Sequence, residues 1–511
     1  MKVGRNLLAG LANSVWSALI TFAVIPIYLR FLGSESYGLI GFFTTTQALI
    51  VLLDFGLSST INREIARSTS PESHRDAAQL LHTLDFVYWG IALLIGITVI
   101  AISPYIAEHW LQSKKLDAST ISHAIMLMGI VIACRWPIAL YQGALIGSQR
   151  LSLQSGINIV MVTLSHLGAV AVLIFLSPTI EAYFIWQAFV GLIYVVTIRI
   201  AAWSVVGKPA GLTFSTTNLK NSWRFSVGMS AISITGLLFM QLDKLILSKL
   251  ISLESFGHYM LATVLVSGLY LLITPVYNIV FPKFSALVAA KQDRQLEHLY
   301  LSGTRLFASL LFPLAMLLAV FSYSIVFIWT GNESIAHDVA PLVSILAVGS
   351  AIHGVMYFPY ALQLAYGKTS IPLKINALLI VLTVPVTVYL TLYLGPLGGA
   401  LAWLVLHICY LFIGVHLTHK ELLKDTGWVW ITECVGMPLI ISILLGIFGY
   451  YFIAESRDFH IYIKLTLGVV VVLIAILLSI LSSPMLRKLP LNPFALMNVH
   501  QNETSHSRDL Q

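Results

Sequence analysis

The sequence predicts an all-α polytopic membrane protein with about fourteen transmembrane helices, and three observations lead to this fold class. The chain has 511 residues, of which 58% are hydrophobic and only 10% are charged, whereas a soluble domain has roughly 25% charged residues. Apolar runs of about 20 residues, long enough to cross a bilayer, recur along the whole sequence. Lysine and arginine are distributed very unevenly between the two sides of these runs.

Each apolar run is interpreted as a helix, because hydrocarbon offers the backbone no other way to satisfy its hydrogen bonds. The first run follows a basic start and lacks a small-residue cleavage site, so it is expected to stay as a span and not to be a signal peptide. The three cysteines fall inside such runs, which favours buried thiols over disulfides. The expected spans are residues 7–29, 38–57, 84–107, 121–145, 154–176, 182–203, 223–250, 258–280, 304–329, 339–362, 371–393, 398–418, 429–453 and 461–481.

The orientation follows from the positive-inside rule. An even number of spans places both termini on one side, and most of the 29 Lys and Arg residues lie in or beside the loops of that side. The sequence therefore predicts cytoplasmic N- and C-termini. Since the basic residues are scattered over short loops, no nucleic-acid partner is expected. The basic residues of the opposite side are Arg30, Lys114, Lys115, Lys249, Arg457 and Lys464.

An internal repeat divides the chain. A shift of about 219 residues lays Glu35-Ser36-Tyr37-Gly38 on Glu254-Ser255-Phe256-Gly257. Six spans per copy give both copies the same orientation, so we expect a pseudo-two-fold axis along the membrane normal and two lobes that flank a central cavity. The predicted organisation is an N-terminal six-helix lobe (1–222), a C-terminal six-helix lobe (223–420), two additional transmembrane helices (421–482) and a polar, disordered cytoplasmic tail (483–511).

The order and spacing of several short motifs resemble those of bacterial polysaccharide-unit flippases. This group contains the O-antigen translocases and exopolysaccharide exporters of the multidrug/oligosaccharidyl-lipid/polysaccharide exporter superfamily, and the resemblance covers about residues 1–420. One departure is Ser252, which stands where a second glycine is expected. The motifs are Pro26-x-Tyr28-x-x-x-Leu32-Gly33-x-x-x-Tyr37-Gly38, then Asp54-Phe55-Gly56-Leu57, and then Gln241-x-Asp243-Lys244.

The resemblance implies a function in the bacterial cytoplasmic (inner) membrane. Two lobes would rock between inward-open and outward-open states and move a polyprenyl-diphosphate-linked oligosaccharide from the inner to the outer leaflet. The implied partners are this substrate, H⁺ or Na⁺ as the coupling ion, membrane lipids, and a polysaccharide polymerase with its assembly proteins. The two spans beyond twelve favour the lipid-linked sugar branch over the multidrug branch.

Two polar residues at matching depths are the first candidates for substrate binding. Arg135 lies ten residues from the cytoplasmic end of its span, roughly 15 Å deep at 1.5 Å per residue, and its planar guanidinium suits phosphate oxygens. The alternative is a structural ion pair or a carbonyl contact. His353 has the equivalent depth in the second copy. It would assist binding or respond to protons, or else form a hydrogen bond between helices.

The pair Asp243 and Lys244 interrupts the first span of the second copy, where a charge costs at least about 2.5 kcal/mol. Adjacent helical residues point about 100° apart. We therefore expect Lys244 to face the cavity as a second anion site and Asp243 to pair with a base from another helix, with Arg30 as the candidate. The alternative is a salt bridge that locks helices or closes an outer gate.

Four charged residues, Asp54, Asp85, Arg63 and Arg67, gather at the cytoplasmic ends of the second and third spans. Breakable ion pairs among them would make a gate, and anchoring at the membrane interface fits equally well. Glu433, outside the repeated part, is assigned a structural or snorkelling role.

No enzyme is predicted, because the sequence contains no catalytic, nucleotide-binding or metal-binding motif; neither a cofactor nor a metal is expected. A drug or small-cation/H⁺ antiporter of the same superfamily remains an alternative, although it would need an acid-rich cavity. A polytopic polysaccharide polymerase or ligase usually needs a large outer loop, and here the longest is about a dozen residues. A structural scaffold would leave the charges within spans unexplained.

Overall fold

The structure is a computed structural model. It describes residues 2–209, 211, 213–456 and 459–483, with side chains described for all of these except residues 2–5, 7, 217–219 and 221–233. The predicted disordered tail lies outside the described residues from residue 484 onward.

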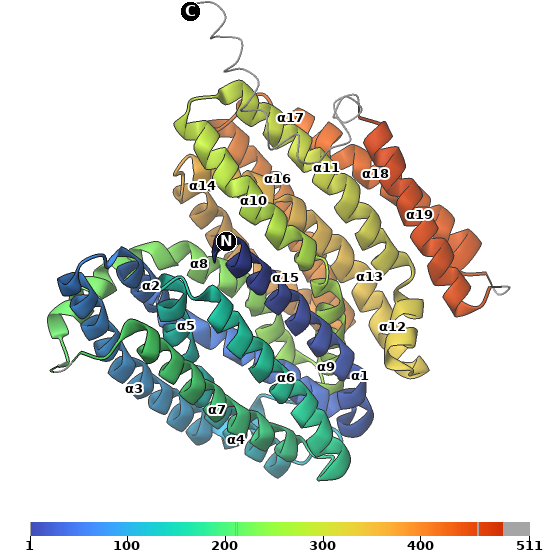
Figure 1. The fold of residues 1–511 in the computed structure, drawn as a ribbon. Coiled ribbons are helices and arrows are strands. Elements are labelled where there is room, and N and C mark those ends of the chain that lie inside the picture. Colours follow the sequence, from blue (N-terminus) through green and yellow to red (C-terminus); the bar gives the residue numbers. More distant parts are fainter. Residues whose placement is uncertain (1, 210, 212, 457–458, 484–511) are drawn as a thin grey trace, which may run out of the picture. The chain divides into compact units, whose positions relative to one another are not determined.

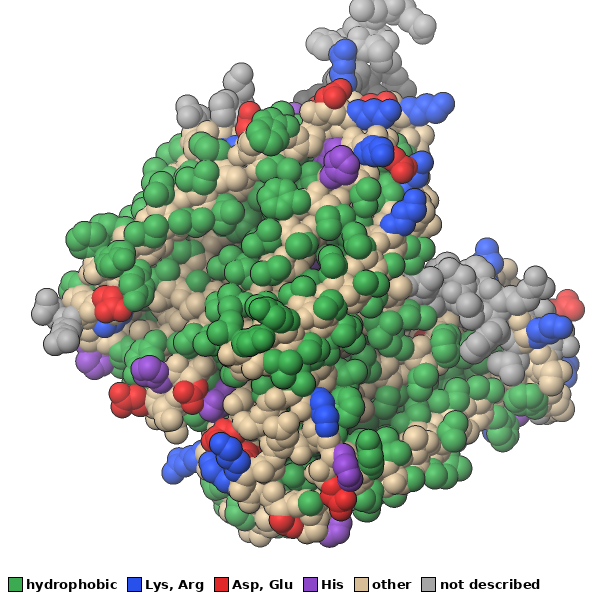
Figure 2. Space-filling view, turned by 180° about the vertical axis from the view of Figure 1, so that it is seen from behind, with side chains coloured by type: hydrophobic (Ala, Val, Ile, Leu, Met, Phe, Trp, Pro, Cys, Tyr) green, Lys and Arg blue, Asp and Glu red, His purple; other side chains and the backbone are tan. Residues whose placement is uncertain are grey.

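Every named secondary-structure element of the described residues is a helix (Figure 1). Twelve described segments are long and apolar enough to cross a membrane. The prediction of an all-α polytopic membrane protein is therefore confirmed. Figure 2 shows hydrophobic side chains over most of the face in view and charged side chains mainly toward its edges, as expected of a surface that meets lipid.

The expected spans correspond to these segments, with some differences. Spans 258–280 and 304–329 are each divided between two helices, of which only Tyr270–Ala289 and Asp293–Val320 are among the twelve segments. The first segment, Leu8–Asp54, contains both span 7–29 and span 38–57. Span 223–250 falls in helix α8 (Thr216–Leu250), part of whose side chains lie outside the described set.

The chain divides into two compact units. Unit 1 comprises Met1–Ser267, Val326–Leu346 and Thr369–Cys409, and unit 2 comprises Gly268–Ile325, Ala347–Lys368 and Tyr410–Gln511. The predicted lobes, 1–222 and 223–420, were defined by the sequence repeat and not by packing, so the two units do not test them and they stay a prediction.

Unit 1 is built on its first nine helices together with α15. Glycines allow close packing here, since a Cβ atom at Gly96 of α3 would crowd Ala133 of α4 and one at Gly129 would crowd Val99. In Figure 1, α3, α4 and α7 accordingly lie side by side. The helices are α1 (Lys2–Ile50), α2 (Leu57–Arg67), α3 (Pro71–His109), α4 (Ala118–Arg135), α5 (Ile138–Gly147), α6 (Leu151–Phe175), α7 (Ile180–Val206), α8, α9 (Leu253–Ser267) and α15 (Ser370–Leu394).

Unit 2 has its apolar core between α11, α18 and α19, where Met316, Phe321, Ile453 and Val471 pack together. Helices α12 (Ser322–Thr330), α13 (Glu333–Val355) and α16 (Pro396–Glu421) contribute residues to both units. The helices of unit 2 alone are α10 (Tyr270–Ala289), α11 (Asp293–Val320), α14 (Tyr357–Ala365), α17 (Gly427–Val429), α18 (Met437–Gly449) and α19 (Ile461–Leu481).

The two copies of the repeat turn differently after their first helix. In the first copy the chain kinks inside α1 at Gly33, whose φ of 79° and ψ of 172° favour glycine. In the second copy α8 ends at Leu250 and α9 begins at Leu253. Ser252, which replaces the expected glycine, accepts a hydrogen bond from the backbone N–H of Ser255 at 3.3 Å. The serine therefore acts as a helix cap.

Candidate functional site

Two helices are broken at matching positions of the repeat. The span predicted at 121–145 is divided into α4, which ends at Arg135, and α5, which begins at Ile138. Pro137 lies between them and has no backbone N–H to continue the helix. The span predicted at 339–362 is divided between Val355 and Tyr357, about 219 residues later. Both predicted polar residues, Arg135 and His353, thus lie at breaks.

The Arg135 side chain contacts only neutral groups among the described residues. Its Nη2 atom donates to the hydroxyl of Ser165 at 3.2 Å and to the amide oxygen of Gln187 at 2.5 Å. Its guanidinium lies 5.8 Å from the ring centroid of Phe43. No described acidic side chain forms an ion pair with it, so the site carries a net positive charge.

Polar partners that the sequence analysis missed hold Arg135 in place. The Ser165 hydroxyl donates to the Gln187 amide oxygen at 2.5 Å, and the Gln187 amide donates to the Ser165 carbonyl at 3.2 Å. Next to Ser165, the ring of His166 contacts the hydroxyls of Tyr28 and Thr21, each at 3.2 Å. The sequence signal that could have identified these partners is the presence of uncharged polar residues inside the apolar spans 154–176 and 182–203.

His353 belongs to unit 2 and is 9% exposed. The hydroxyl of Tyr270 lies 2.7 Å from its Nδ1 atom, and the ring of Tyr357 packs edge-on against it with centroids 5.3 Å apart. The hydrogen bond expected for a histidine between helices is therefore present. A direct role of His353 in substrate binding stays a prediction.

The predicted pairing of Asp243 with Arg30 is wrong. Asp243 pairs with its own neighbour, since Lys244 Nζ lies 3.2 Å from its Oδ1 atom, while Arg30 is exposed. The hydroxyl of Tyr259 donates to Asp243 at 2.7 Å. Although the Cβ atoms of the two residues point about 100° apart, the flexible four-carbon side chain of lysine is long enough to bring its ammonium back to the neighbouring carboxylate.

Lys244 is correspondingly enclosed and only 7% exposed. Its ammonium also donates to the Met240 carbonyl at 2.9 Å and lies 5.2 Å from the ring centroid of Trp403. Because the charge is neutralised by Asp243, the geometry favours the helix-locking alternative over an open anion site. The substrate-binding role of Lys244 remains an untested prediction.

Among the described residues Asp54, Asp85, Arg63 and Arg67 form no ion pairs with one another, and the alternative of anchoring at the membrane interface stays a prediction. Asp54 accepts hydrogen bonds from Tyr88 and from the hydroxyl of Ser58, the latter at 2.8 Å. Arg63 pairs with the adjacent Glu64 at 2.6 Å.

Asp85 instead pairs with Arg199 at 2.7 Å. It also accepts a hydrogen bond from Tyr141. The sequence did not indicate Arg199 as this partner, because a basic residue near the end of a span, here 182–203, is typical of the adjoining loop. A base in the last turns of a span is a candidate partner for a buried acid in another span.

The two copies of the repeated motif meet at one helix crossing. A Cβ atom at Gly38 would overlap the backbone oxygen of Leu253, and one at Gly257 would overlap the backbone oxygen of Ser34. Residues 34 and 253, like 38 and 257, are related by the same shift of 219, so the contact is reciprocal. The repeated glycines therefore serve close approach of α1 and α9.

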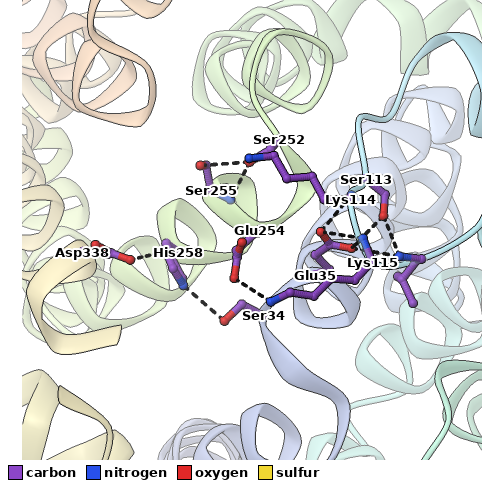
Figure 3. Close-up of polar contacts among 11 residues, drawn as sticks. Ser34, Glu35, Ser113, Lys114, Lys115, Ser252, Glu254, Ser255, His258 and Asp338 are labelled. Atoms are coloured by element: carbon purple, nitrogen blue, oxygen red, sulfur yellow. Dashed lines mark hydrogen bonds and ion pairs between the residues drawn. The ribbon is translucent and has the colours of Figure 1, made fainter. Parts of the chain in front are cut away.

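Polar contacts surround this crossing (Figure 3). The carboxylate of Glu35, 4% exposed, accepts hydrogen bonds from the backbone N–H groups of Lys114, Lys115 and Leu116 at 3.0–3.2 Å and from the hydroxyl of Ser113 at 2.6 Å. Such charge-assisted bonds are strong. Glu35 therefore fixes the loop that follows α3 against the kink in α1.

The second copy contributes weaker ion pairs to the same region (Figure 3). Lys115 pairs with Glu254 at 3.2 Å, and Asp338 of α13 lies 3.5 Å from His258. The opposite ring nitrogen of His258 is 3.2 Å from the hydroxyl of Ser34. An exposed pair such as Lys115–Glu254 contributes about 0–1 kcal/mol, and His258, which is buried, pairs with Asp338 as an ion only when it is protonated. We call the crossing and these contacts the latch.

Substitution of the crossing glycines is expected to destabilise the latch. Gly38→Ala and Gly257→Ala should each lower the free energy of unfolding by about 1–3 kcal/mol, because the added methyl group meets backbone that cannot rotate away. Gly90→Ala is the matched control, since nothing lies within 4 Å of its Cβ position and alanine favours helix. Detergent-induced unfolding measures the effect. A Gly257→Ala protein as stable as the control would contradict the close crossing.

Broken helices with polar side chains inside apolar spans are typical of membrane transport proteins. The fold and the site together define a multi-pass membrane protein of this class. Residues 3–288, more than half of the chain, match the family of polysaccharide biosynthesis proteins, and the chain belongs to this family. The resemblance found in the sequence is thereby confirmed at the family level.

Solved structures share the fold at low sequence identity. The lipid II flippase MurJ in an inward closed conformation is 14% identical, with a TM-score of 0.65 over 92% of this chain and 97% of its own. An inward-facing multidrug resistance MATE family transporter of the MOP superfamily is 15% identical, with a TM-score of 0.64 over 81% of this chain and 99% of its own. The Vibrio cholerae MATE transporter VcmN is 14% identical, with a TM-score of 0.58 over 84% of this chain and 98% of its own. No curated protein gave a significant match to the sequence.

Proposed function

We propose that the protein is a flippase for a polyprenyl-diphosphate-linked oligosaccharide, an O-antigen or exopolysaccharide repeat unit. It moves this lipid from the inner to the outer leaflet of the bacterial cytoplasmic membrane by alternating access, with both termini in the cytoplasm. Membership of the polysaccharide biosynthesis family supports the substrate class. The fold shared with MurJ over 92% of the chain supports a translocation mechanism.

The observation that carries the proposal is the uncompensated charge of Arg135. A diphosphate that crosses the hydrocarbon region needs a cation with free hydrogen-bonding capacity. Arg135 has neutral partners only among the described residues and lies at a helix break inside a span. An antiporter for cationic drugs would instead need a free acid at this depth. The described acids Asp85 and Asp243 are paired with bases, and Asp54 is hydrogen-bonded to Tyr88 and Ser58.

In this proposal the remaining charged residues serve gating or ion coupling during the transport cycle. We place the latch and the Asp243–Lys244 pair on the outer side, and Asp54, Asp85 and Arg63 on the cytoplasmic side, following the predicted orientation. Arg30, exposed beside the kink in α1, belongs to the outer set. An H⁺ or Na⁺ gradient supplies the driving force, and a polysaccharide polymerase with its assembly proteins receives the flipped lipid.

Proteoliposomes containing the purified full chain test the proposal. They are loaded with a fluorescent polyprenyl diphosphate that carries a short oligosaccharide, and a membrane-impermeant quencher reports the leaflet of the label. An imposed H⁺ or Na⁺ gradient is expected to accelerate the change of leaflet above that of protein-free vesicles. Equal rates with and without protein, together with uptake of a cationic dye, would replace the flippase by the antiporter.

A further inference from the structure

Unit 2 contains a group of aromatic side chains around the break between α13 and α14. We call it the tyrosine cluster; its members are Tyr270, Tyr277, His353, Tyr357, Tyr360 and Tyr410. Tyr277 of α10 stacks on Tyr360 with centroids 5.8 Å apart and meets Tyr357 edge-on at 5.5 Å. Tyr410 of α16 lies 5.9 Å from His353. Four helices, α10, α13, α14 and α16, therefore supply one aromatic surface.

Three hydroxyls of the cluster form no described hydrogen bond. Tyr277, Tyr357 and Tyr360 are half-buried, and their described contacts are with other rings. Two fully buried tyrosines, Tyr88 and Tyr259, donate to aspartates, whereas the hydroxyl of the buried Tyr300 has no partner among the described residues. A tyrosine used for packing alone usually finds a partner for its hydroxyl, so the cluster has hydroxyls available to a ligand.

The cluster is suited to a neutral ligand. None of the described contacts of Tyr277, Tyr357 and Tyr360 is with a charged side chain. An aromatic site for a cation needs ring faces open toward a common point, whereas Tyr277 and Tyr360 stack on each other. Exposed ring edges and hydroxyls fit a sugar ring instead, whose C–H groups contact the rings while its hydroxyls exchange hydrogen bonds with the phenols.

The repeat places this cluster at the counterpart of the Arg135 break. The second copy therefore has neutral aromatic and phenolic groups where the first has a cation with neutral polar partners. A lipid-linked oligosaccharide likewise has two parts, an anionic diphosphate and an uncharged sugar. The chemistry of the tyrosine cluster thus suits the uncharged part of such a ligand.

We propose that the tyrosine cluster binds a pyranose ring of the substrate and thereby contributes sugar-dependent affinity. This inference rests on the proposed function, because it assigns the sugar of that substrate to Tyr277, Tyr357 and Tyr360. The cluster would give the protein a preference for glycosylated over bare polyprenyl diphosphate.

Binding of two probes by the purified full chain tests the inference. The probes are a polyprenyl diphosphate and the same lipid carrying a neutral disaccharide of hexopyranoses, and the readout is the ratio of their dissociation constants. The wild-type protein is expected to bind the glycosylated probe about tenfold more tightly. Tyr357→Leu and Tyr360→Leu should each reduce this ratio several-fold while affinity for the bare lipid stays within about twofold.

Control variants separate binding from packing. Tyr393→Leu, at a tyrosine 74% exposed in α15, should leave the ratio unchanged. Tyr357→Phe and Tyr360→Phe preserve the rings and are expected to fold normally, yet still lower the ratio because they lack the hydroxyl. A ratio near one in the wild type, or an unchanged ratio in both the Leu and Phe variants, would overturn the inference. The cation tetraphenylphosphonium is the third probe: if the wild type binds it and the variants do not, the cluster is a site for a cation and the inference is also overturned. Wild-type protein that binds neither lipid would instead refute the proposed function.

Discussion

Arg135→Ala is expected to abolish export of the surface polysaccharide while the protein remains in the membrane at its normal amount. Removal of the guanidinium loses a charge-assisted contact to the diphosphate, worth about 1.5–3 kcal/mol or roughly 10–100-fold in affinity. The fold should tolerate the change, because Ser165 and Gln187 stay hydrogen-bonded to each other. Surface polymer in a strain that depends on the variant measures the effect.

Two further substitutions test whether the effect depends on the planar guanidinium group of Arg135. Arg135→Lys keeps the charge but loses the planar pair of donors, so partial export is expected. Arg294→Ala removes an exposed arginine in the first turn of α11 and should export normally. Full-length polymer at wild-type levels in the Arg135→Ala strain would remove Arg135 from the substrate path.

The helices could be predicted from the sequence because the length of an apolar run is a local property. All fourteen expected spans fall in helical segments, although those at 121–145, 258–280, 304–329 and 339–362 are each divided between two helices. Several helices extend beyond the expected ends, as α3 does by beginning at Pro71 rather than near residue 84. The kink at Gly33 and the break at Pro137 also had local signals, a glycine and a proline. The repeat was detectable for the same reason, since its glycines mark a helix crossing.

The partners of the charged residues could not be predicted, because they depend on how each helix is rotated about its axis. Asp243 was expected to reach Arg30 and instead meets Lys244. Asp85 was grouped with Arg63, but its base comes from α7. Arg305, at the start of expected span 304–329, is 4% exposed. Its guanidinium donates to the Glu433 carbonyl and, at 3.0 Å, to the hydroxyl of Ser482.

The ion pairs that the structure shows reduce the number of candidate anion-binding residues in unit 1. Three charges that sequence position marked as candidates, those of Lys244, Asp243 and Asp85, are each neutralised by a described partner. Arg135 is the candidate cation inside a span of this unit whose described partners are all neutral, whereas the acid Asp54 is hydrogen-bonded to the neutral Tyr88 and Ser58. A substrate with a strong negative charge therefore has one preferred site there, and the neutralised pairs are better suited to holding or gating helices.

Asp243→Asn is expected to lower the free energy of unfolding by about 3–5 kcal/mol, because it leaves the ammonium of Lys244 buried without its counter-charge. Lys244→Met, which leaves the carboxylate alone, should cost a similar amount. The double variant Asp243→Asn/Lys244→Met should regain most of the loss, since a neutral pair of similar volume needs no counter-charge and the thioether can still contact Trp403. Detergent-induced unfolding of the four proteins gives the coupling free energy.

Transport by the same four proteins decides between the two roles of the pair. If the pair only locks helices, the double variant recovers transport together with stability. If Asp243 also carries the coupling ion, the double variant is stable but no longer responds to an imposed H⁺ or Na⁺ gradient. A stable Asp243→Asn single variant would contradict the enclosed geometry itself, in which Asp243 is 2% exposed and bonded to both Lys244 and Tyr259.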